Sequence, residues 1–167
     1  MTDMWKQLTQ KARKAIFLAQ EEAGRLGYNH VGSEHLLLAL AREEDCVASR
    51  ILEQLGVDVG TIRVEVIGQL SRGSEPLGEE MQLTAEAKEA IDLAFDEGKQ
   101  MKDEWVGTEH LLIGLARSAE GMASQVLSRL GVDVSQIRCQ LRNLQAGTLP
   151  FERVEGNGPS SMSVSAK

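Results

Sequence analysis

The fold is decided by a block that occurs twice, first as Val31-Gly32-Ser33-Glu34-His35-Leu36-Leu37-Leu38-Ala39-Leu40-Ala41-Arg42. The same pattern returns 75 positions later as Val106-Gly107-Thr108-Glu109-His110-Leu111-Leu112-Ile113-Gly114-Leu115-Ala116-Arg117. Around these blocks, residues 8–70 align with residues 83–145 without a gap, and 27 of the 63 positions are identical. Such internal similarity means that one structural unit is used twice.

Apolar residues in each copy recur at the three-and-four spacing of amphipathic helices. Four such helices fit each copy, and no segment shows the period-two pattern of a strand. Thr9 and Thr84 are expected to cap the first helices, and Ser33 and Thr108 the second ones. Two Leu-Gly-Val-Asp corners then end the third helices with a left-handed glycine and cap the fourth with an aspartate. We therefore predict an all-α fold of eight helices, in two four-helix repeats related by a pseudo-twofold axis.

The repeats, at residues 8–70 and 83–145, are predicted to form one domain over residues 1–147. Because a half of roughly 60 residues buries little surface alone, we expect the two halves to share an interface and fold as one body. Residues 73–82 have the polar, turn-rich composition of a linker. The Gly- and Ser-rich residues 148–167 are predicted to be a flexible tail.

The charge and the cysteines narrow the class of protein. A formal net charge of −7 argues against general nucleic-acid binding, which needs clustered Lys and Arg. No apolar run approaches the roughly 20 residues that cross a bilayer, and no signal-peptide core is present at the N-terminus. The two cysteines, Cys46 and Cys139, occupy unrelated positions of the repeats. Two cysteines without a repeated pattern do not suggest a disulfide framework. They fit the cytoplasm, or another reducing compartment such as a plastid stroma.

Three sets of residues resemble a known family, the Clp N-terminal domain, which is the double repeat at the front of Hsp100 unfoldases. They are Ala19-Gln20-Glu21-Glu22-Ala23, the paired Val-Gly-[Ser/Thr]-Glu-His-Leu-Leu blocks, and the paired Leu-Gly-Val-Asp corners. The resemblance covers residues 4–146 and is strongest to ClpC-type domains. It implies a module that binds adaptor proteins (MecA-like or McsB-like) and client polypeptides, and passes clients to an ATPase ring and a ClpP-type protease.

The sequence predicts binding without catalysis. There is no Gly-x-x-x-x-Gly-Lys-[Ser/Thr] loop for nucleotide phosphates, no His-Glu-x-x-His zinc motif and no Gly-x-Ser-x-Gly nucleophile elbow. Adjacent helix residues point about 100° apart, so Glu34 and His35 are badly placed to ligate one metal ion. We therefore expect no enzyme activity, metal or cofactor. Two interpretations stay open: the recognition module of an unfoldase, or a free-standing regulator that docks on a Clp protease complex.

Glu34 and Glu109 are the polar residues of the blocks that the folding of a helix does not explain. In the ClpC-type domains of some bacteria, the matching Glu contacts the guanidinium of phosphoarginine, and a carboxylate can accept two hydrogen bonds from that group. The phosphoryl group would need donors at helix starts. The candidate donors are Ser33, Thr108, Thr9 and Thr84. Alternatively, each Glu is favoured simply by the helix dipole.

Acidic residues near these positions make phosphoarginine the secondary hypothesis and general adaptor or client binding the primary one. Glu86, Asp103 and Glu104 add negative charge beside a proposed phosphate site, which would weaken it. His35 and His110 are expected to pack or to bond to the neighbouring turn rather than to touch a ligand.

A second candidate surface comprises Trp5, Leu8, Leu83 and Lys88, at the first helix of each repeat. In the family that it resembles, this region is a hydrophobic groove that accepts peptides. The alternative is structural: Leu8 and Leu83 would staple their helix starts, and Trp5 would cover the edge of the core.

Overall fold

A computed structural model describes residues 2–43, 45–69 and 82–146. These residues form nine helices and two short strands, of which α1 (Thr2–Gln7) precedes the first repeat. The first repeat contains α2 (Gln10–Arg25), β1 (His30–Val31), α3 (Ser33–Arg42), α4 (Val47–Gln54) and α5 (Val59–Gln69). The second contains β2 (Gln82–Leu83), α6 (Ala85–Gln100), α7 (Thr108–Arg117), α8 (Met122–Arg129) and α9 (Val134–Gln145).

The all-α prediction is confirmed, and α1 adds a helix to the eight that the sequence predicted. The turn chemistry is confirmed as well. Gly56 and Gly131 follow the third helices at φ values of 80° and 81°, and the Asp58 and Asp133 carboxylates accept backbone N–H groups at the start of the fourth. Residues 73–81 of the predicted linker, and the predicted tail, lie outside the described residues.

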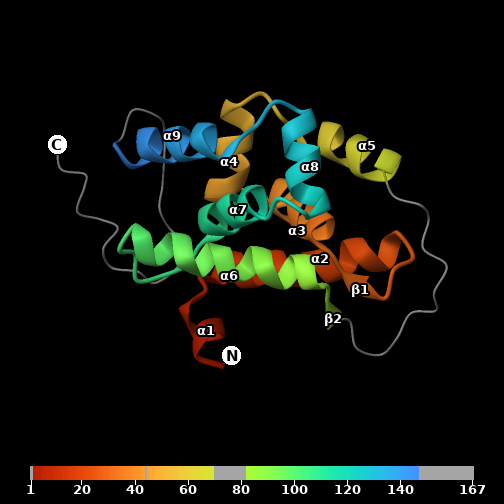
Figure 1. The fold of residues 1–167 in the computed structure, drawn as a ribbon, viewed down its shortest axis with the longest axis horizontal. Helices are drawn as coiled ribbons and strands as arrows, with labels where there is room; N and C mark the ends of the chain where they lie inside the picture. Colours follow the sequence, from red (N-terminus) through yellow and green to blue (C-terminus); the bar gives the residue numbers. More distant parts are fainter. Residues whose placement is uncertain (1, 44, 70–81, 147–167) are drawn as a thin grey trace.

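The helices form layers in which equivalent helices lie at equivalent depths (Figure 1). The first helices, α2 and α6, lie on one side, and the second helices, α3 and α7, lie in the middle. The third and fourth helices of both repeats cover the other side. The core between them consists of Leu, Ile, Val and Ala, and none of the described helices is long and apolar enough to span a membrane.

The two repeats interlock through their third helices. Helix α4 of the first repeat contacts α7 and α9 of the second, and α8 of the second contacts α3 and α5 of the first. Each contact therefore occurs twice, as a pseudo-twofold axis requires. Because the third helix of each repeat packs on both repeats, the two halves share a single core.

The start of each third helix is capped by a hydroxyl group from the other repeat. Ser33 Oγ accepts the backbone N–H of Ala123 at 3.1 Å, and Thr108 Oγ1 accepts that of Ala48 at 3.2 Å. This corrects the predicted caps, because Gly32 and Gly107 are the N-cap residues of α3 and α7. The hydroxyl groups instead satisfy helix donors across the seam between the repeats.

The expectation that no strand would occur is wrong at one place. Strands β1 and β2 pair in parallel, with His30 opposite Gln82 and Val31 opposite Leu83. The equivalent pair across the pseudo-axis is an isolated parallel bridge between Leu8 and Val106. Two-residue strands are too short to show alternation in the sequence. Their importance is positional, because each pair joins the start of one repeat to the block of the other.

Candidate functional site

The start of α3 is built in the same way as the start of α7. The backbone N–H of Gly32 donates to Nδ1 of His35 at 2.9 Å, and that of Gly107 donates to Nδ1 of His110 at the same distance. This is half of a capping box, in which the third helical residue binds the N-cap backbone. Both imidazoles are also buried, with 1% exposed. The prediction that the histidines pack or bond to the neighbouring turn is therefore confirmed.

Glu34 follows the N-cap and folds back over it. A Cβ atom placed on Gly32 would lie 2.6 Å from Glu34 Oε1, so a larger residue there would displace the carboxylate from this position. The side chain is 14% exposed. Burial raises the pKa of Glu34, and the like charge of Glu86 adds to this; a hydrogen bond from its own backbone N–H and the nearby His30 act in the opposite direction.

Glu109 occupies the equivalent position of the second repeat and lies deeper, with its side chain 2% exposed. Its Oε2 atom is 3.9 Å from Nδ1 of His110, close to the 3.8 Å between Glu34 and His35 in the first repeat. The two carboxylates therefore have the same local geometry and different access to solvent.

The segment that leads into each glutamate's helix is bonded to a threonine-capped helix start of the other repeat. The N–H of Thr84 donates to the carbonyl of Val31 at 2.9 Å, and the N–H of Thr9 donates to that of Val106 at 3.0 Å. Thr84 and Thr9 accept the backbone N–H groups of Ala87 and Ala12 respectively, which confirms both predicted caps. We call the resulting places the Glu34 site, with Thr84, and the Glu109 site, with Thr9.

Ser33 and Thr108 do not belong to these sites as ligand donors. They are 1% and 0% exposed, and their oxygen atoms accept the helix caps across the seam. The prediction that grouped them with the phosphate donors is corrected for this reason: a hydroxyl buried between the repeats cannot reach a ligand on the surface.

The two sites differ in the charges around them. The second residue after the cap differs between the repeats: Lys11 stands in the first turn of α2 where Glu86 stands in α6. Lys11 is ion-paired with Glu43 at 3.2 Å. Burial is the main cause of the raised pKa of Glu34, and the negative charge of Glu86 adds to it. Charge alone therefore disfavours an anionic ligand more at the Glu34 site than at the Glu109 site.

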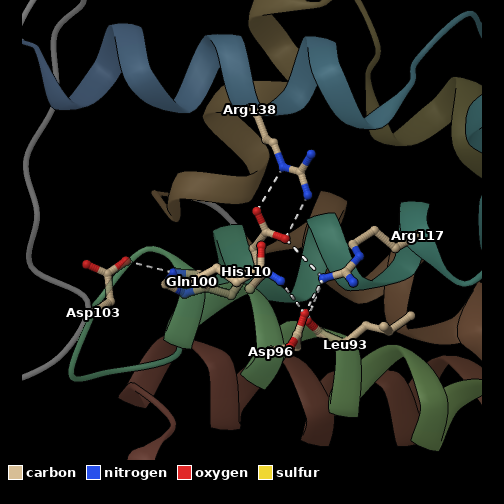
Figure 2. Close-up of polar contacts among 8 residues, drawn as sticks. Leu93, Asp96, Gln100, Asp103, His110, Arg117 and Arg138 are labelled. Atoms are coloured by element: carbon tan, nitrogen blue, oxygen red, sulfur yellow. Dashed lines mark hydrogen bonds and ion pairs between the residues drawn. The ribbon is translucent and has the colours of Figure 1, made fainter.

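The histidines of the two blocks also have different partners on their second nitrogen. His110 Nε2 donates to Asp103 Oδ2 at 2.9 Å (Figure 2). Tyr28 takes the place of Asp103 in the first repeat, where its ring lies 5.5 Å from that of His35. Within the described residues, Nε2 of His35 has no hydrogen-bond partner, and burial lowers the pKa of His35 to about 4.

The second candidate surface forms an apolar pocket of about 190 Å³ between the first helices of the two repeats. All four predicted residues line it, together with four that the sequence reasoning missed. The lining residues are Trp5, Leu8, Ile16, Leu83, Lys88, Ile91, Asp92 and Phe95. Both repeats contribute, so the pocket exists only because the strand pairs bring the two helix starts together.

Two exposed aromatic residues stand at the edge of this apolar pocket. Trp5 is 40% exposed, and Phe17 is 58% exposed. Their rings meet edge to face, with centroids 6.2 Å apart. Phe17 could have been noticed in the sequence, because its equivalent is the acidic Asp92 and a shared core does not require it. Exposed large apolar side chains beside a pocket are typical of an interaction surface.

A pair of buried ionic clusters, which we call the Glu–Arg triads, was also missed. In the second repeat, Glu97 accepts hydrogen bonds from Arg117 and Arg138 (Figure 2). In the first repeat, Glu22 is bound in the same way by Arg42 and Arg63. The glutamate and both arginines are identical in the two copies of the repeat. This identity of charged residues was the signal in the sequence that could have revealed the triads.

The Glu–Arg triads connect the first, second and fourth helices of each repeat. Hydrogen bonds from Arg138 lower the pKa of Glu97; for Glu22, the bonds and charge of Arg63 outweigh the effect of burial and lower the pKa. Their role is therefore structural. Within the described part of the chain, no three His, Cys, Asp or Glu side chains converge as metal ligands.

Comparisons with known proteins agree with this architecture. The model of the Clp repeat N-terminal domain matches residues 7–127 and 82–167. Chaperone protein ClpC1 of Arabidopsis thaliana chloroplasts is 40% identical over 95% of the chain, and ClpC/MecB of Bacillus subtilis, a negative regulator of genetic competence, is 42% identical over 84%. The chain spans 17% of the length of either relative.

Solved structures show the same fold. The N-terminal domain of ClpD from Arabidopsis thaliana superposes with a TM-score of 0.67 at 24% identity, covering 82% of this chain and 96% of that one. The sequence matches and the structural match all indicate one family, and the double repeat with its interlocked helices fits that family. The chain belongs to the Clp N-terminal domain family.

Proposed function

We propose that this domain is a recognition module of a Clp-type protein unfolding and proteolysis system, and that it captures adaptors and client polypeptides at the apolar pocket. The observation that carries the proposal is the apolar pocket itself, with Trp5 and Phe17 exposed at its edge. Among proteins of this fold, a ClpV N-domain is known in complex with a VipB peptide. Its 14% identity supports the fold alone and transfers no contact residue.

The chemistry of the apolar pocket suits an apolar segment of an adaptor or an unfolded client. Its walls are aliphatic and aromatic, and Lys88 and Asp92 supply one charge of each sign among them. Burying one large apolar side chain there contributes about 1.5–3 kcal/mol. Such weak, general binding fits a module that meets many clients, and it raises their local concentration at an ATPase ring and a ClpP-type protease.

Chemical-shift mapping by NMR tests this proposal. A peptide rich in Leu and Phe should perturb amide signals of residues that line the apolar pocket, such as Leu83 and Ile91. Perturbations centred instead on α5 and α8, on the other side of the molecule, would contradict the proposed surface. The proposed setting is a reducing compartment, the cytoplasm or a plastid stroma, and both cysteines are free.

Phosphoarginine recognition at the Glu34 and Glu109 sites is the second candidate function. The observation that favours it is that backbone pairing joins the segment before each glutamate to a threonine-capped helix start of the other repeat. The carboxylate can accept bonds from the guanidinium. The threonine oxygen already accepts a backbone N–H, so its own O–H group can donate to the phosphoryl group together with the helix terminus.

Calorimetric titration with free phosphoarginine tests this second function. We expect binding by the wild-type chain and at least tenfold weaker binding for Glu34→Gln, whose carboxylate is 14% exposed. Glu109→Gln should have the smaller effect, because its carboxylate is only 2% exposed. Glu53→Gln, an exposed change of equal charge on α4, is the matched control. Absence of heat from the wild-type chain at millimolar ligand would remove phosphoarginine from the account.

A further inference from the structure

The outer face of α2 and α6, which we call the α2–α6 face, is centred on the apolar pocket. Both helices lie on the side of the molecule away from the third and fourth helices (Figure 1). Leu8 and Leu83 are equivalent residues of the two repeats, and so are Ile16 and Ile91. All four line the apolar pocket. The pocket therefore lies on the pseudo-twofold axis, with one repeat on each side of it.

The two halves of the α2–α6 face carry opposite charge. Lys11 and Lys14 of α2 are equivalent to Glu86 and Glu89 of α6, so two cations in one repeat become two anions in the other. The cations are bonded to a single carboxylate, that of Glu43, at 3.2 and 3.6 Å. One half of the face therefore keeps an excess of positive charge.

The remaining charges on the two helices keep this difference. Arg13 adds a third cation to the first half of α2, which contains no acidic residue. On α6, besides Glu97 in its triad, the acidic residues outnumber the basic ones. The acidic residues are Glu86, Glu89, Asp92 and Asp96, and the basic ones are Lys88 and Lys99.

The centre of the face is apolar and exposed. Phe17 is 58% exposed and Trp5 is 40% exposed, and the residue equivalent to Phe17 is the charged Asp92. A side chain that only completes the shared core should keep its character in both copies. An apolar centre with charges at its rim is the usual anatomy of a protein–protein interface.

A second copy of the chain carries the complementary face. In a twofold pair, each contact of one copy with the other is made twice. If the second copy is turned over about an axis parallel to the helices, α2 of each copy covers α6 of the other, and basic meets acidic. Rotation about the perpendicular axis in the face would lay α2 on α2 and α6 on α6, with like charges opposed. Charge therefore selects the first arrangement.

The direction of the helices decides which charges meet. The bridge between Leu8 and Val106 holds the start of α2 beside the segment that follows α6, so the two helices run in opposite directions. In the pair, the first half of α2 then covers the second half of the other copy's α6. Lys14, whose side chain is 63% exposed, comes to lie opposite Asp92, which is exposed and lines the apolar pocket.

We infer that a second copy of this chain docks on the α2–α6 face, in a twofold pair in which each copy covers the apolar pocket of the other. The pairing does not depend on the proposed client binding. Its consequence does, because Trp5 and Phe17 would serve both interactions. A client must displace the second copy, so pairing withholds the apolar pocket from weakly bound clients.

Sedimentation equilibrium at tens to hundreds of micromolar measures the pairing. The wild type should show a monomer–dimer equilibrium that is at least threefold weaker at high salt, since salt screens exposed charges. Lys14→Glu sets like charges against each other at both contacts of the pair, and so does Asp92→Lys. Each variant alone should pair at least tenfold more weakly than the wild type.

An equimolar mixture of the two variants should recover the dimer. One of its two contacts is the native Lys14–Asp92 pair, and the other is the same pair with the charges exchanged. Recovery also shows that both variants are folded. The controls are Arg129→Glu on α8, at a 64% exposed side chain, and Glu53→Lys on α4, which should leave the equilibrium unchanged.

Two outcomes would overturn the inference. A wild type that stays monomeric at the highest concentration would leave the α2–α6 face to clients alone. Dimers that survive both single changes, or that the mixture does not recover, would exclude the arrangement with α2 on α6. Peptide binding at the apolar pocket is measured separately, so neither outcome decides the proposed client binding.

Discussion

At the scale of single residues, the histidines and the glutamates of the repeated Glu-His pairs have different surroundings. The histidines bind their own helix starts and are buried. Glu34 and Glu109 stand at the same helix starts, with 14% and 2% of their side chains exposed, and belong to the proposed phosphoarginine sites. The sequence predicted that the histidines pack or bond to the neighbouring turn, and that the folding of a helix leaves Glu34 and Glu109 unexplained. It could not show which histidine has a second partner, since Asp103 and Tyr28 act through the tertiary structure.

The low pKa of His35 predicts a pH-dependent stability. The folded chain holds this imidazole neutral down to about pH 4, whereas the unfolded chain protonates it below about 6.5. The unfolded state therefore binds more protons between these values. The free energy of unfolding should fall as the pH drops from 6.5 to 4, by about 3 kcal/mol in total for this group.

Urea unfolding of the wild type and of His35→Gln at several pH values measures this contribution. A glutamine at the same position can still accept the Gly32 N–H and does not titrate. The difference between the two proteins isolates His35 from Glu34, whose raised pKa acts with the opposite sign, removing stability as the pH rises through it. Parallel pH profiles for the two proteins would refute the assignment.

At the scale of the elements, helices and turns were predictable from local chemistry, and contacts between helices were not. The caps at Thr9 and Thr84, the left-handed glycines and the aspartate caps follow from neighbouring residues. The caps supplied by Ser33 and Thr108 join residues 90 and 60 positions apart. The Glu–Arg triads and the short strands are likewise pairings between distant segments.

Ser33→Ala should destabilise the protein by about 1–2 kcal/mol, because the buried N–H of Ala123 loses its acceptor. Ser128→Ala is the matched control on the exposed face of α8, and it should change stability by less than about 0.5 kcal/mol. Urea denaturation gives both values. Equal effects of the two changes would show that the cap across the seam has no energetic role.

At the scale of the whole molecule, the interlocked third helices predict a single cooperative unit. The sequence suggested this from the size of each half, and the contacts of α4 and α8 supply the physical reason. Hydrogen exchange during urea unfolding should give coincident midpoints for amides of α3 and α7. Ser33→Ala should lower both midpoints equally, although it changes only the first repeat. Two separate transitions would mean that the repeats are independent domains.

The position of the apolar pocket follows from this architecture, because both repeats must be in place to form it. The sequence predicted four of its residues through the family resemblance, and it missed others such as Phe95, which also lines it. A surface that depends on the whole fold cannot be derived from one helix at a time. We propose that clients bind at this surface.

The most direct measurement compares the binding of reduced, carboxymethylated lactalbumin, an unfolded model client, to two variants by fluorescence anisotropy. Trp5→Lys places a charge at the apolar pocket, and Val64→Lys makes a matched change at a 72% exposed position on α5. We predict at least tenfold weaker binding for Trp5→Lys and unchanged binding for Val64→Lys. Equal affinities for the wild type and both variants would contradict the proposed binding surface.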